Sequence, residues 1–443
     1  MLADRPAPTK GGGARGMGAR AKARHDGRMR YSAVSLFRQG LAGHTGWGQA
    51  WRSPVPQRSY DAVIVGGGGH GLAAAYYLAK NHGLRRVAVL EKGWIGGGNT
   101  GRNTTIVRSN YFFPESAAIY DFALKLYEGL SQELDYNIML SQRGMLMLAH
   151  TEHELDMMAR SVNAMQINGI DVELLDAKQV RDEVPLLNFA PDARYEIHGG
   201  FTQRRAGTAR HDAVAWGYAR AASALGVDII QGCEVTGFDI IAGRVTGVMT
   251  SRGPIGAGVV GLAAAGHSGV LAGLAGFRLP IQSYALQAMV SEPVKPVLGT
   301  VVMSPATGMY VSQSDKGELV FGAGLDLYPS YAQRGNLPVE QAVVAGMLEI
   351  FPAFRRLKLL RAWAGLVDVC WDYSPIIGPT PVAGMFVNCG WGTGGFKAIP
   401  AGGWMLAHLL ATGAHHPISA PFDLARFTTG RLIDEAAGAG IAH

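Results

Sequence analysis

Cysteine is scarce in this chain of 443 residues, which contains only Cys233, Cys370 and Cys389. Three cysteines without a CxxC pair predict neither a disulfide framework nor a zinc site, so we expect a reducing compartment and no metal. No uninterrupted apolar run reaches the roughly 18 residues that a membrane span needs. Residues 1–28 also lack the apolar stretch of a secretory signal. We therefore expect a cytoplasmic protein that does not cross a membrane, with Cys370 and Cys389 as buried small residues.

An excess of one charge is also missing from most of the chain. The formal net charge is +6, from 40 Lys and Arg against 34 Asp and Glu. Residues 1–28 hold seven basic and two acidic residues, which leaves 33 basic and 32 acidic residues elsewhere. A nearly neutral body argues against nucleic acid as a partner. We interpret residues 1–28 as a basic, disordered tail or as the result of a mis-assigned start, with Met29 as the true initiator.

Apolar content of 48% is high enough for a folded protein, and the length suits two or three domains. A β-branched strand over 61–65, a glycine turn and a helix over 72–79 are followed by a strand over 86–91, which is a βαβ opening. Further helices are predicted over 116–135, 151–168, 211–225, 338–360 and 398–410. Further strands are predicted over 227–231, 244–250 and 256–265, and residues 279–325 alternate as in an antiparallel sheet.

The turn after the first strand reads Gly66-x-Gly68-x-x-Gly71, with Gly69 and His70 between. Gly66 suits the tight turn, Gly68 lets a pyrophosphate approach the backbone, and Gly71 lets helix and strand pack closely. The start of the helix offers free N–H groups to phosphates. Glu91 ends the next strand and can accept hydrogen bonds from a ribose. These features predict a dinucleotide site, and leave NAD and FAD open.

Two further segments favour FAD over NAD. The glycine-lined stretch that includes Asn99 and Thr100 is suited to wrapping a ribityl chain. A second glycine cluster over 390–395 opens another helix, whose dipole can face the pyrimidine edge of a flavin, where negative charge develops on reduction. A nicotinamide enzyme does not need this second cluster.

Five blocks, in one order, carry a resemblance to a known family: residues 66–71, 97–99 with 102–111, 209–212, 233–237 and 387–397. With them the chain resembles the FAD-dependent amine oxidoreductases of the D-amino-acid-oxidase type, and among these the β subunits of heterotetrameric sarcosine oxidases. The resemblance extends from residue 60 to residue 443. It implies an α/β fold, with a Rossmann-like FAD-binding domain interrupted by an α+β substrate domain whose sheet is mainly antiparallel.

The resemblance also implies an activity. Sarcosine is oxidatively demethylated to glycine, electrons pass from noncovalent FAD through a covalent FMN to O2, and H2O2 forms. The position that matches the FMN attachment residue is His211, with Arg210 beside it. The implied partners are α, γ and δ subunits, and the one-carbon unit goes to tetrahydrofolate on a partner subunit, where NAD is also expected.

Arg108 and Lys397 match the pair that binds the substrate carboxylate, for which cations, and arginine in particular, are suited. The other residues expected to contact FAD, besides those in the first glycine turn and Glu91, are Asn99, Thr100, Thr104, Thr105, Ile106, Val235, Gly392, Gly394, Gly395 and Lys397. Asp368 and Asp372 are interpreted as structural or flavin-pocket residues. We assign no catalytic role to His267, and no dedicated general base is evident.

Two alternatives stay open on the sequence alone. The chain can be a dehydrogenase of another secondary amine, such as dimethylglycine or proline, or an electron-transfer flavin subunit without its own substrate. The predicted domains are the tail 1–28, an arm 29–59, an FAD-binding domain over 60–145, 200–275 and 361–413, a substrate or interface domain over 146–199 and 276–360, and an extension over 414–443.

Overall fold

The computed structural model describes residues 32–45 and 49–435 and divides the chain into two compact units, 1–49 and 50–443. The predicted tail 1–28 and the end of the predicted extension, 436–443, lie outside the described residues. In the first unit, helix α1 (Ala33–Leu41) begins after Ser32, whose hydroxyl accepts a hydrogen bond from the Ser35 N–H at 3.1 Å. None of its residues is buried.

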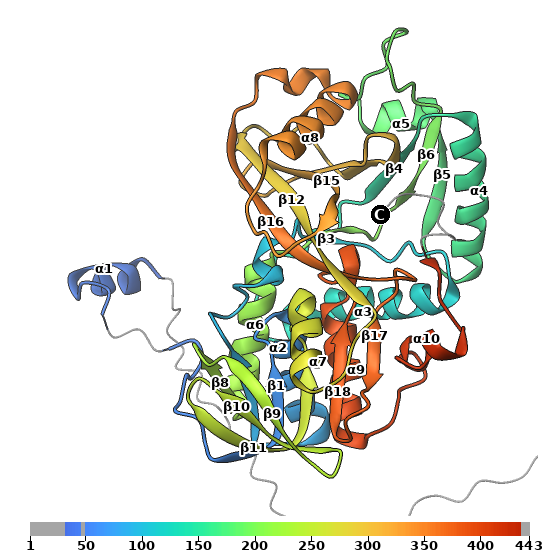
Figure 1. The fold of residues 1–443 in the computed structure, drawn as a ribbon. Coiled ribbons are helices and arrows are strands. Elements are labelled where there is room, and N and C mark those ends of the chain that lie inside the picture. The colour runs from blue at the N-terminus through green and yellow to red at the C-terminus, as the bar shows by residue number, and fades with distance from the viewer. Residues whose placement is uncertain (1–31, 46–48, 436–443) are drawn as a thin grey trace, which may run out of the picture. The chain divides into compact units, whose positions relative to one another are not determined.

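The second unit contains two eight-stranded sheets (Figure 1). The first has the order β17-β18-β11-β1-β2-β8, with β10 and β9 added beside β11. Its strands are β1 (Ser59–Val65), β2 (Val87–Glu91), β8 (Asp228–Gln231), β9 (Val235–Ile241), β10 (Arg244–Thr250), β11 (Gly253–Leu262), β17 (Ile376–Pro379) and β18 (Met385–Cys389). The five strands from β18 to β8 are parallel, whereas β9, β10 and β17 pair antiparallel.

Both faces of the first sheet are buried, which explains why its strands read as nearly continuous apolar runs. Successive side chains of β1 point to opposite sides of the sheet. Ile64 belongs to the hydrophobic core on one side, and Val63 belongs to the core on the other side. The helices of this part are α2 (Gly69–His82), α3 (Pro114–Glu133), α6 (His211–Ala224), α7 (Ser268–Leu274) and α9 (Ile399–Thr412). Helix α2 lies between the sheet, α6 and α9, so its residues Leu72 to Ala79 are all buried.

The second sheet has the order β16-β12-β15-β14-β13-β4-β6-β5, and only its β13–β4 pair is parallel. Its strands are β4 (Met145–Ala149), β5 (Val172–Asp176), β6 (Gly199–Gln203), β12 (Ile281–Pro293), β13 (Val301–Ser304), β14 (Met309–Gln313), β15 (Glu318–Pro329) and β16 (Leu359–Cys370). Helices α4 (Glu152–Ile167), α5 (Ala177–Glu183) and α8 (Leu337–Ile350) pack on it.

Short elements connect these layers. A two-stranded sheet pairs β3 (Ile106–Val107) with β7 (Gly207–Thr208). The 3₁₀ helices are η1 (Asn99–Arg102), η2 (Ala265–His267), η3 (Pro305–Thr307), η4 (Pro352–Arg356), η5 (Gly392–Gly394) and η6 (Ala420–Phe422), and the last helix is α10 (Arg426–Thr429).

The predicted fold class is confirmed: a largely parallel sheet is combined with a mainly antiparallel one, whose strands are inserted between those of the first along the chain. Three predicted domain boundaries do not coincide with the division between the two sheets. Residues 200–203 of β6 and residues 361–370 of β16 pair in the second sheet, although both were assigned to the FAD-binding domain. The predicted boundary at 145/146 lies within β4. Division into two domains along the two sheets remains our proposal.

Two predicted elements also differ in extent. The helix predicted over 338–360 ends at Ile350, because Pro352 follows and disfavours a helical conformation at the preceding residue. The strand predicted over 256–265 covers 253–262 instead, and Ala265, at φ 46°, already lies in the next helix.

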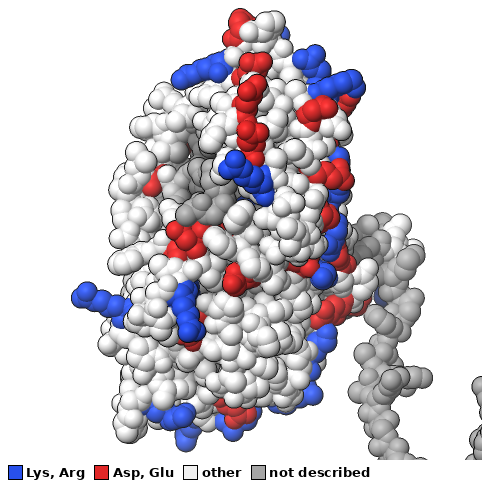
Figure 2. All heavy atoms as spheres, turned by 90° about the vertical axis from the view of Figure 1, so that its right-hand side faces the viewer, with Lys and Arg blue, Asp and Glu red and all other residues white. Residues whose placement is uncertain are grey.

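On the face of the molecule drawn in Figure 2, Lys and Arg side chains lie among Asp and Glu side chains. This mixture agrees with the near-neutral balance expected outside residues 1–28. Among residues 32–45 and 49–435, no helix combines the length and the apolar character that a membrane span requires.

Candidate active site

The first glycine turn joins β1 to α2 in a conformation that side chains would obstruct. Gly66 has φ 116°, and a Cβ there would lie 2.4 Å from the Ala263 carbonyl oxygen. A Cβ on Gly71 would lie 2.0 Å from the Gly66 carbonyl oxygen. Gly68 precedes α2 and supplies no side-chain cap, so backbone N–H groups at the helix start are available to an anion. This is the arrangement that a pyrophosphate needs.

Glu91 holds this turn against the end of β2. Its Oε2 accepts a hydrogen bond from the Gly67 N–H, and its Oε1 accepts one from the Gly93 N–H, each at 2.8 Å. A carboxylate has lone pairs for further donors, so Glu91 remains able to bind a ribose hydroxyl. The Gly69 N–H donates to the Thr100 hydroxyl at 2.9 Å, which ties the η1 segment to the same turn.

A cavity of about 860 Å³ extends from this turn to the second sheet. Of the predicted cofactor and substrate residues, the following line it: Gly66, Gly68, Gly69, His70, Glu91, Asn99, Thr100, Thr104, Thr105, Ile106, Arg108, Val235, Gly392, Gly395 and Lys397. Two predicted glycines do not. Gly71 faces Gly66, and a Cβ on Gly394 would meet the Tyr120 hydroxyl at 1.9 Å, so both positions serve close packing.

Thr105 has a strained backbone on the wall of this cavity. Its φ of 69° is rare for a β-branched residue. The side-chain oxygen of Asn103 accepts a hydrogen bond from the Thr105 N–H at 2.7 Å, and the Thr105 carbonyl accepts one from Ala209 at 3.0 Å. Such strain, held by surrounding bonds, is typical of binding sites.

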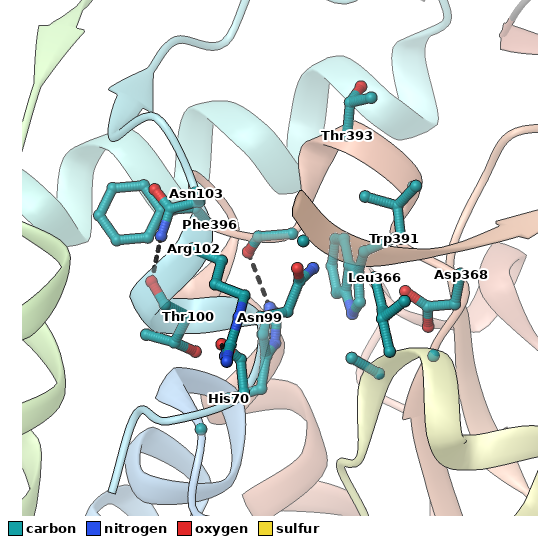
Figure 3. Close-up of a pocket in the computed structure, with 18 of the residues that line it drawn as sticks. His70, Asn99, Thr100, Arg102, Asn103, Leu366, Asp368, Trp391, Thr393 and Phe396 are labelled. Carbon is teal, nitrogen blue, oxygen red and sulfur yellow. Dashed lines mark hydrogen bonds between the residues drawn. The ribbon is translucent and has the colours of Figure 1, made fainter. Parts of the chain in front are cut away.

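A hydrogen-bond chain connects the two glycine clusters through His70 (Figure 3). Its Nε2 lies 2.8 Å from the Gly395 carbonyl oxygen and its Nδ1 lies 3.2 Å from the Asn388 side-chain nitrogen. The Asn388 side-chain oxygen in turn accepts from the Trp391 indole N–H at 2.5 Å. Burial lowers the pKa of His70 to about 4, so the ring is neutral at pH 7. Because a carbonyl can only accept, the proton is on Nε2, and Nδ1 accepts from Asn388.

Arg108 and Lys397 come together at one part of the cavity wall, although 289 positions separate them in sequence. Arg108 is 8% exposed and donates to the Asn110 side-chain oxygen at 3.0 Å. Lys397 is 6% exposed and donates to the Thr393 carbonyl at 3.2 Å and to the Tyr111 hydroxyl at 3.4 Å. The Tyr111 ring centroid lies 4.9 Å from the Arg108 guanidinium carbon and 5.9 Å from Lys397 Nζ.

Neither of these two buried side chains forms an ion pair with a carboxylate of the described residues. Burial lowers the pKa of the Lys397 ammonium well below its usual range, and the positive charge of Arg108 acts in the same direction. Burying two such groups together is costly without an anion. The pair is therefore suited to binding a carboxylate that enters the cavity.

His211 lies elsewhere, as the first residue of α6 and off the wall of this cavity. Its Nδ1 is buried and has no hydrogen-bond partner among the described residues. Burial lowers the pKa of His211, as does the positive charge of Arg210, against the opposing effect of Asp212. Arg210 forms an ion pair with Asp212. Helix α6 packs against η1, whose residues line the cavity.

The sequence analysis missed several residues of this site and left one undecided. Tyr111, Asn388, Trp391 and Glu435 line the cavity but were not predicted as site residues. Tyr111, Asn388 and Trp391 lie within the resembling blocks 102–111 and 387–397, but nothing in those blocks shows which distant segments they contact. Glu435 lies outside all of these blocks. Asp368, left between two roles, also lines the cavity and accepts a hydrogen bond from the Gly390 N–H at 2.5 Å, and burial raises its pKa to about 7.

The other predictions on single residues have mixed outcomes. Asp372 is structural: it forms a buried ion pair with Arg426 at 2.7 Å. Cys370 and Cys389 are buried free thiols, as expected. His267 lines the cavity, 5.2 Å from the Tyr331 ring between centroids. Among residues 32–45 and 49–435, no group of three or more His, Cys, Asp or Glu side chains could hold a metal ion.

Comparisons with known proteins identify the family of this chain. The sequence pattern of the family described as FAD dependent oxidoreductase (DAO) matches residues 61–409. The chain is 55% identical to a sarcosine oxidase subunit beta of Rhodobacter capsulatus, over 94% of this chain and 100% of that one. It is 56% identical to a sarcosine oxidase subunit beta of an Arthrobacter species, over 89% of this chain and 97% of that one.

Solved structures show the same fold. The L-proline dehydrogenase of P. horikoshii superposes with a TM-score of 0.80 at 27% identity, over 85% of this chain and 100% of that one. The glycine oxidase of Geobacillus kaustophilus has a TM-score of 0.76 at 23% identity, over 84% of this chain and 99% of that one. By its sequence and its fold, this chain belongs to the family of FAD-dependent oxidoreductases, and within it to the sarcosine oxidase β subunits.

Proposed function

We propose that this chain oxidises sarcosine to glycine with FAD, as the β subunit of a heterotetrameric sarcosine oxidase. One observation carries the substrate class: two buried basic side chains, Arg108 and Lys397, face the cavity and form no ion pair with a carboxylate among the described residues. A small amino acid supplies that carboxylate. The names of the relatives that are more than half identical favour sarcosine over other secondary amines.

The residues of the cavity fit FAD. The glycine turn after β1 has room for a pyrophosphate only because it lacks side chains, and the start of α2 directs N–H groups toward it. Glu91 is at the ribose position, and the 390–397 segment, held by His70, is suited to the flavin end. When bound, FAD supplies the two-electron acceptor for the C–H bond of the N-methyl group.

Binding of the substrate carboxylate offsets the free-energy cost of burying two positive charges, Arg108 and Lys397, without an anion. The Arg108 guanidinium offers a forked donor, and the carboxylate stabilises the ammonium form of Lys397. The ammonium form of Lys397 therefore becomes more favourable as the ligand binds. The ammonium group of sarcosine must lose a proton before oxidation, so transfer of one proton from substrate to Lys397 meets both needs. The Tyr111 ring, stacked on Tyr120 with centroids 3.7 Å apart, keeps the two cations in place.

His211 is our candidate for covalent attachment of FMN. Its neutral imidazole keeps a nucleophilic lone pair, since burial and Arg210 both lower its pKa. The packing of α6 against η1 supports an electron path from the FAD cavity to this position. We further propose α, γ and δ subunits as partners, O2 as the final acceptor with H2O2 as product, tetrahydrofolate and NAD on a partner subunit, and a cytoplasmic location.

A second candidate function is proline dehydrogenation, which the superposition on an L-proline dehydrogenase favours. The test is anaerobic addition of sarcosine, dimethylglycine or proline to the assembled complex while the visible absorbance of the flavin is followed. Bleaching by sarcosine at the lowest concentration supports the proposal. Preferential bleaching by proline would replace it with the second candidate, and no bleaching by any amine would indicate an electron-transfer subunit.

A further inference from the structure

The last described residues of the chain are held firmly against the second unit's core. The Ile433 N–H donates to Asp372 at 3.2 Å, and the Ile433 carbonyl accepts from the Ser374 hydroxyl at 2.9 Å. Asp372 itself is fixed by its buried ion pair with Arg426. This anchoring sets where the following residues, up to Glu435, approach the cavity.

Glu435 reaches from this segment to the start of α3. It is only 2% exposed, and its Oε1 accepts a hydrogen bond from the Phe112 N–H at 2.7 Å. Its Oε2 lies 3.4 Å from the Phe113 nitrogen, which donates to it. Phe113 precedes α3 and gives that helix no side-chain cap. Glu435, more than 300 positions away, accepts from the two N–H groups just before the helix. A carboxylate at a helix start is also favoured by the helix dipole.

The segment that Glu435 ties down is the one that carries part of the carboxylate site. Arg108, Asn110 and Tyr111 immediately precede the two N–H groups that it binds. Glu435 also lines the cavity itself. Burial raises the pKa of its carboxyl, while the Phe112 N–H, Ser116 and the positive charge of Arg108 act against that rise. Glu435 and Arg108 therefore interact electrostatically, although they form no ion pair within 4 Å.

We propose that Glu435 is a positioning residue of the substrate site, which holds the 108–113 segment in place and reduces the attraction of Arg108 for carboxylates. The inference rests on the proposed carboxylate site at Arg108 and Lys397. Its two parts act in opposite directions on ligand affinity. The hydrogen bonds strengthen binding because they order the segment, whereas the negative charge weakens binding of another anion.

Two substitutions separate these parts. Glu435→Gln removes the charge and keeps an oxygen that can accept from the Phe112 N–H. Carboxylates should then bind more tightly, by at least about threefold, because a negative charge that repels them has been removed. Glu435→Ala removes both, so the 108–113 segment loses its tether and carboxylates should bind at least about tenfold more weakly. Asp192→Asn is the control, because it removes a negative charge at an exposed position that does not line the cavity.

The measurement is titration of the assembled, flavin-loaded complex with acetate, a carboxylate without an amine, followed by the change in the flavin spectrum. Tighter binding in Glu435→Gln, weaker binding in Glu435→Ala and no change in Asp192→Asn support the inference. Weaker binding in both Glu435 variants would show that Glu435 has only a structural role and would overturn the inference. Unchanged binding in Glu435→Gln would also overturn the inference. If Glu435→Ala fails to fold, the sign of the Glu435→Gln effect still decides.

The acetate titration tests the role of Glu435, whereas bleaching of the flavin by sarcosine tests the proposed function. Either hypothesis can therefore fail while the other stands. If sarcosine does not bleach the flavin but acetate still binds with the expected order of affinities, the proposed substrate is wrong and the role of Glu435 stands. If sarcosine bleaches the flavin and the Glu435 variants bind acetate like the unaltered complex, the proposed function stands and the inference about Glu435 falls.

Discussion

Replacing Lys397 with methionine separates ligand binding from stability at the candidate site. The two side chains have similar length and volume, so the substitution leaves little cavity behind. What disappears is the charge, together with the hydrogen bonds to Thr393 and Tyr111. Arg108 remains, so we expect weaker binding of the substrate carboxylate rather than its loss.

The magnitude follows from the burial of the group. A hydrogen bond to a charged group contributes about 1.5–3 kcal/mol, which corresponds to roughly a 10- to 150-fold increase in KM for sarcosine. The turnover number should fall as well, because methionine cannot accept the proton that the ammonium group of sarcosine loses before oxidation.

Thermal stability of the complex should not fall when Lys397 is replaced, although substrate binding weakens. Burial lowers the pKa of Lys397 in the folded chain below its value in the unfolded chain. Protonation of Lys397 therefore favours the unfolded chain, and the stability present above the unfolded pKa is lost as the pH falls toward the folded pKa. Methionine carries no such penalty, so the thermal midpoint at pH 7 should stay the same or rise.

The assay is steady-state oxidation of sarcosine beside a thermal melt of the same complex, with Lys358→Met as the control at an exposed position. A KM within threefold of the unaltered complex would refute the carboxylate site at Lys397. A midpoint lower by several degrees, with an unchanged KM, would make Lys397 a structural residue instead.

Three further predictions concern FMN, FAD and pH. His211→Ala should release FMN on acid precipitation while FAD binding is unchanged; flavin that stays attached to the protein would contradict the assignment. Gly71→Ala places a Cβ 2.0 Å from the Gly66 carbonyl oxygen and should abolish FAD retention on gel filtration, whereas Gly129→Ala, with open space around it, should not. Because burial raises the pKa of Asp368 to about 7, its stability contribution is lost as the pH rises from about 4 to 7; Asp368→Asn should therefore raise the thermal midpoint more at pH 8 than at pH 4, and equal shifts would argue against a buried carboxylate that ionises.

The sequence was sufficient for the features that depend on local chemistry. The glycine turn after β1 is followed closely in sequence by helix α2 and then by β2, which ends at Glu91. Their spacing alone therefore predicts how these elements are arranged. Blocks of the family's sequence pattern then led to Arg108, Lys397 and His211, whose chemical roles depend on residue type. The ends of helices α3, α4 and α9 were predicted to within two residues.

Tertiary structure alone decided what depends on contacts between distant segments. Assignment of β6 and β16 to the second sheet follows from strand pairing, which neither strand's composition reveals. The lowered pKa of Lys397 comes from burial and from Arg108, and the neutral state of His70 comes from burial beside Gly395. Glu435 and Asn388 are ordinary polar residues in the sequence. They become part of the site only because folding places their partners within hydrogen-bond distance, and a sequence pattern carries no record of such distances.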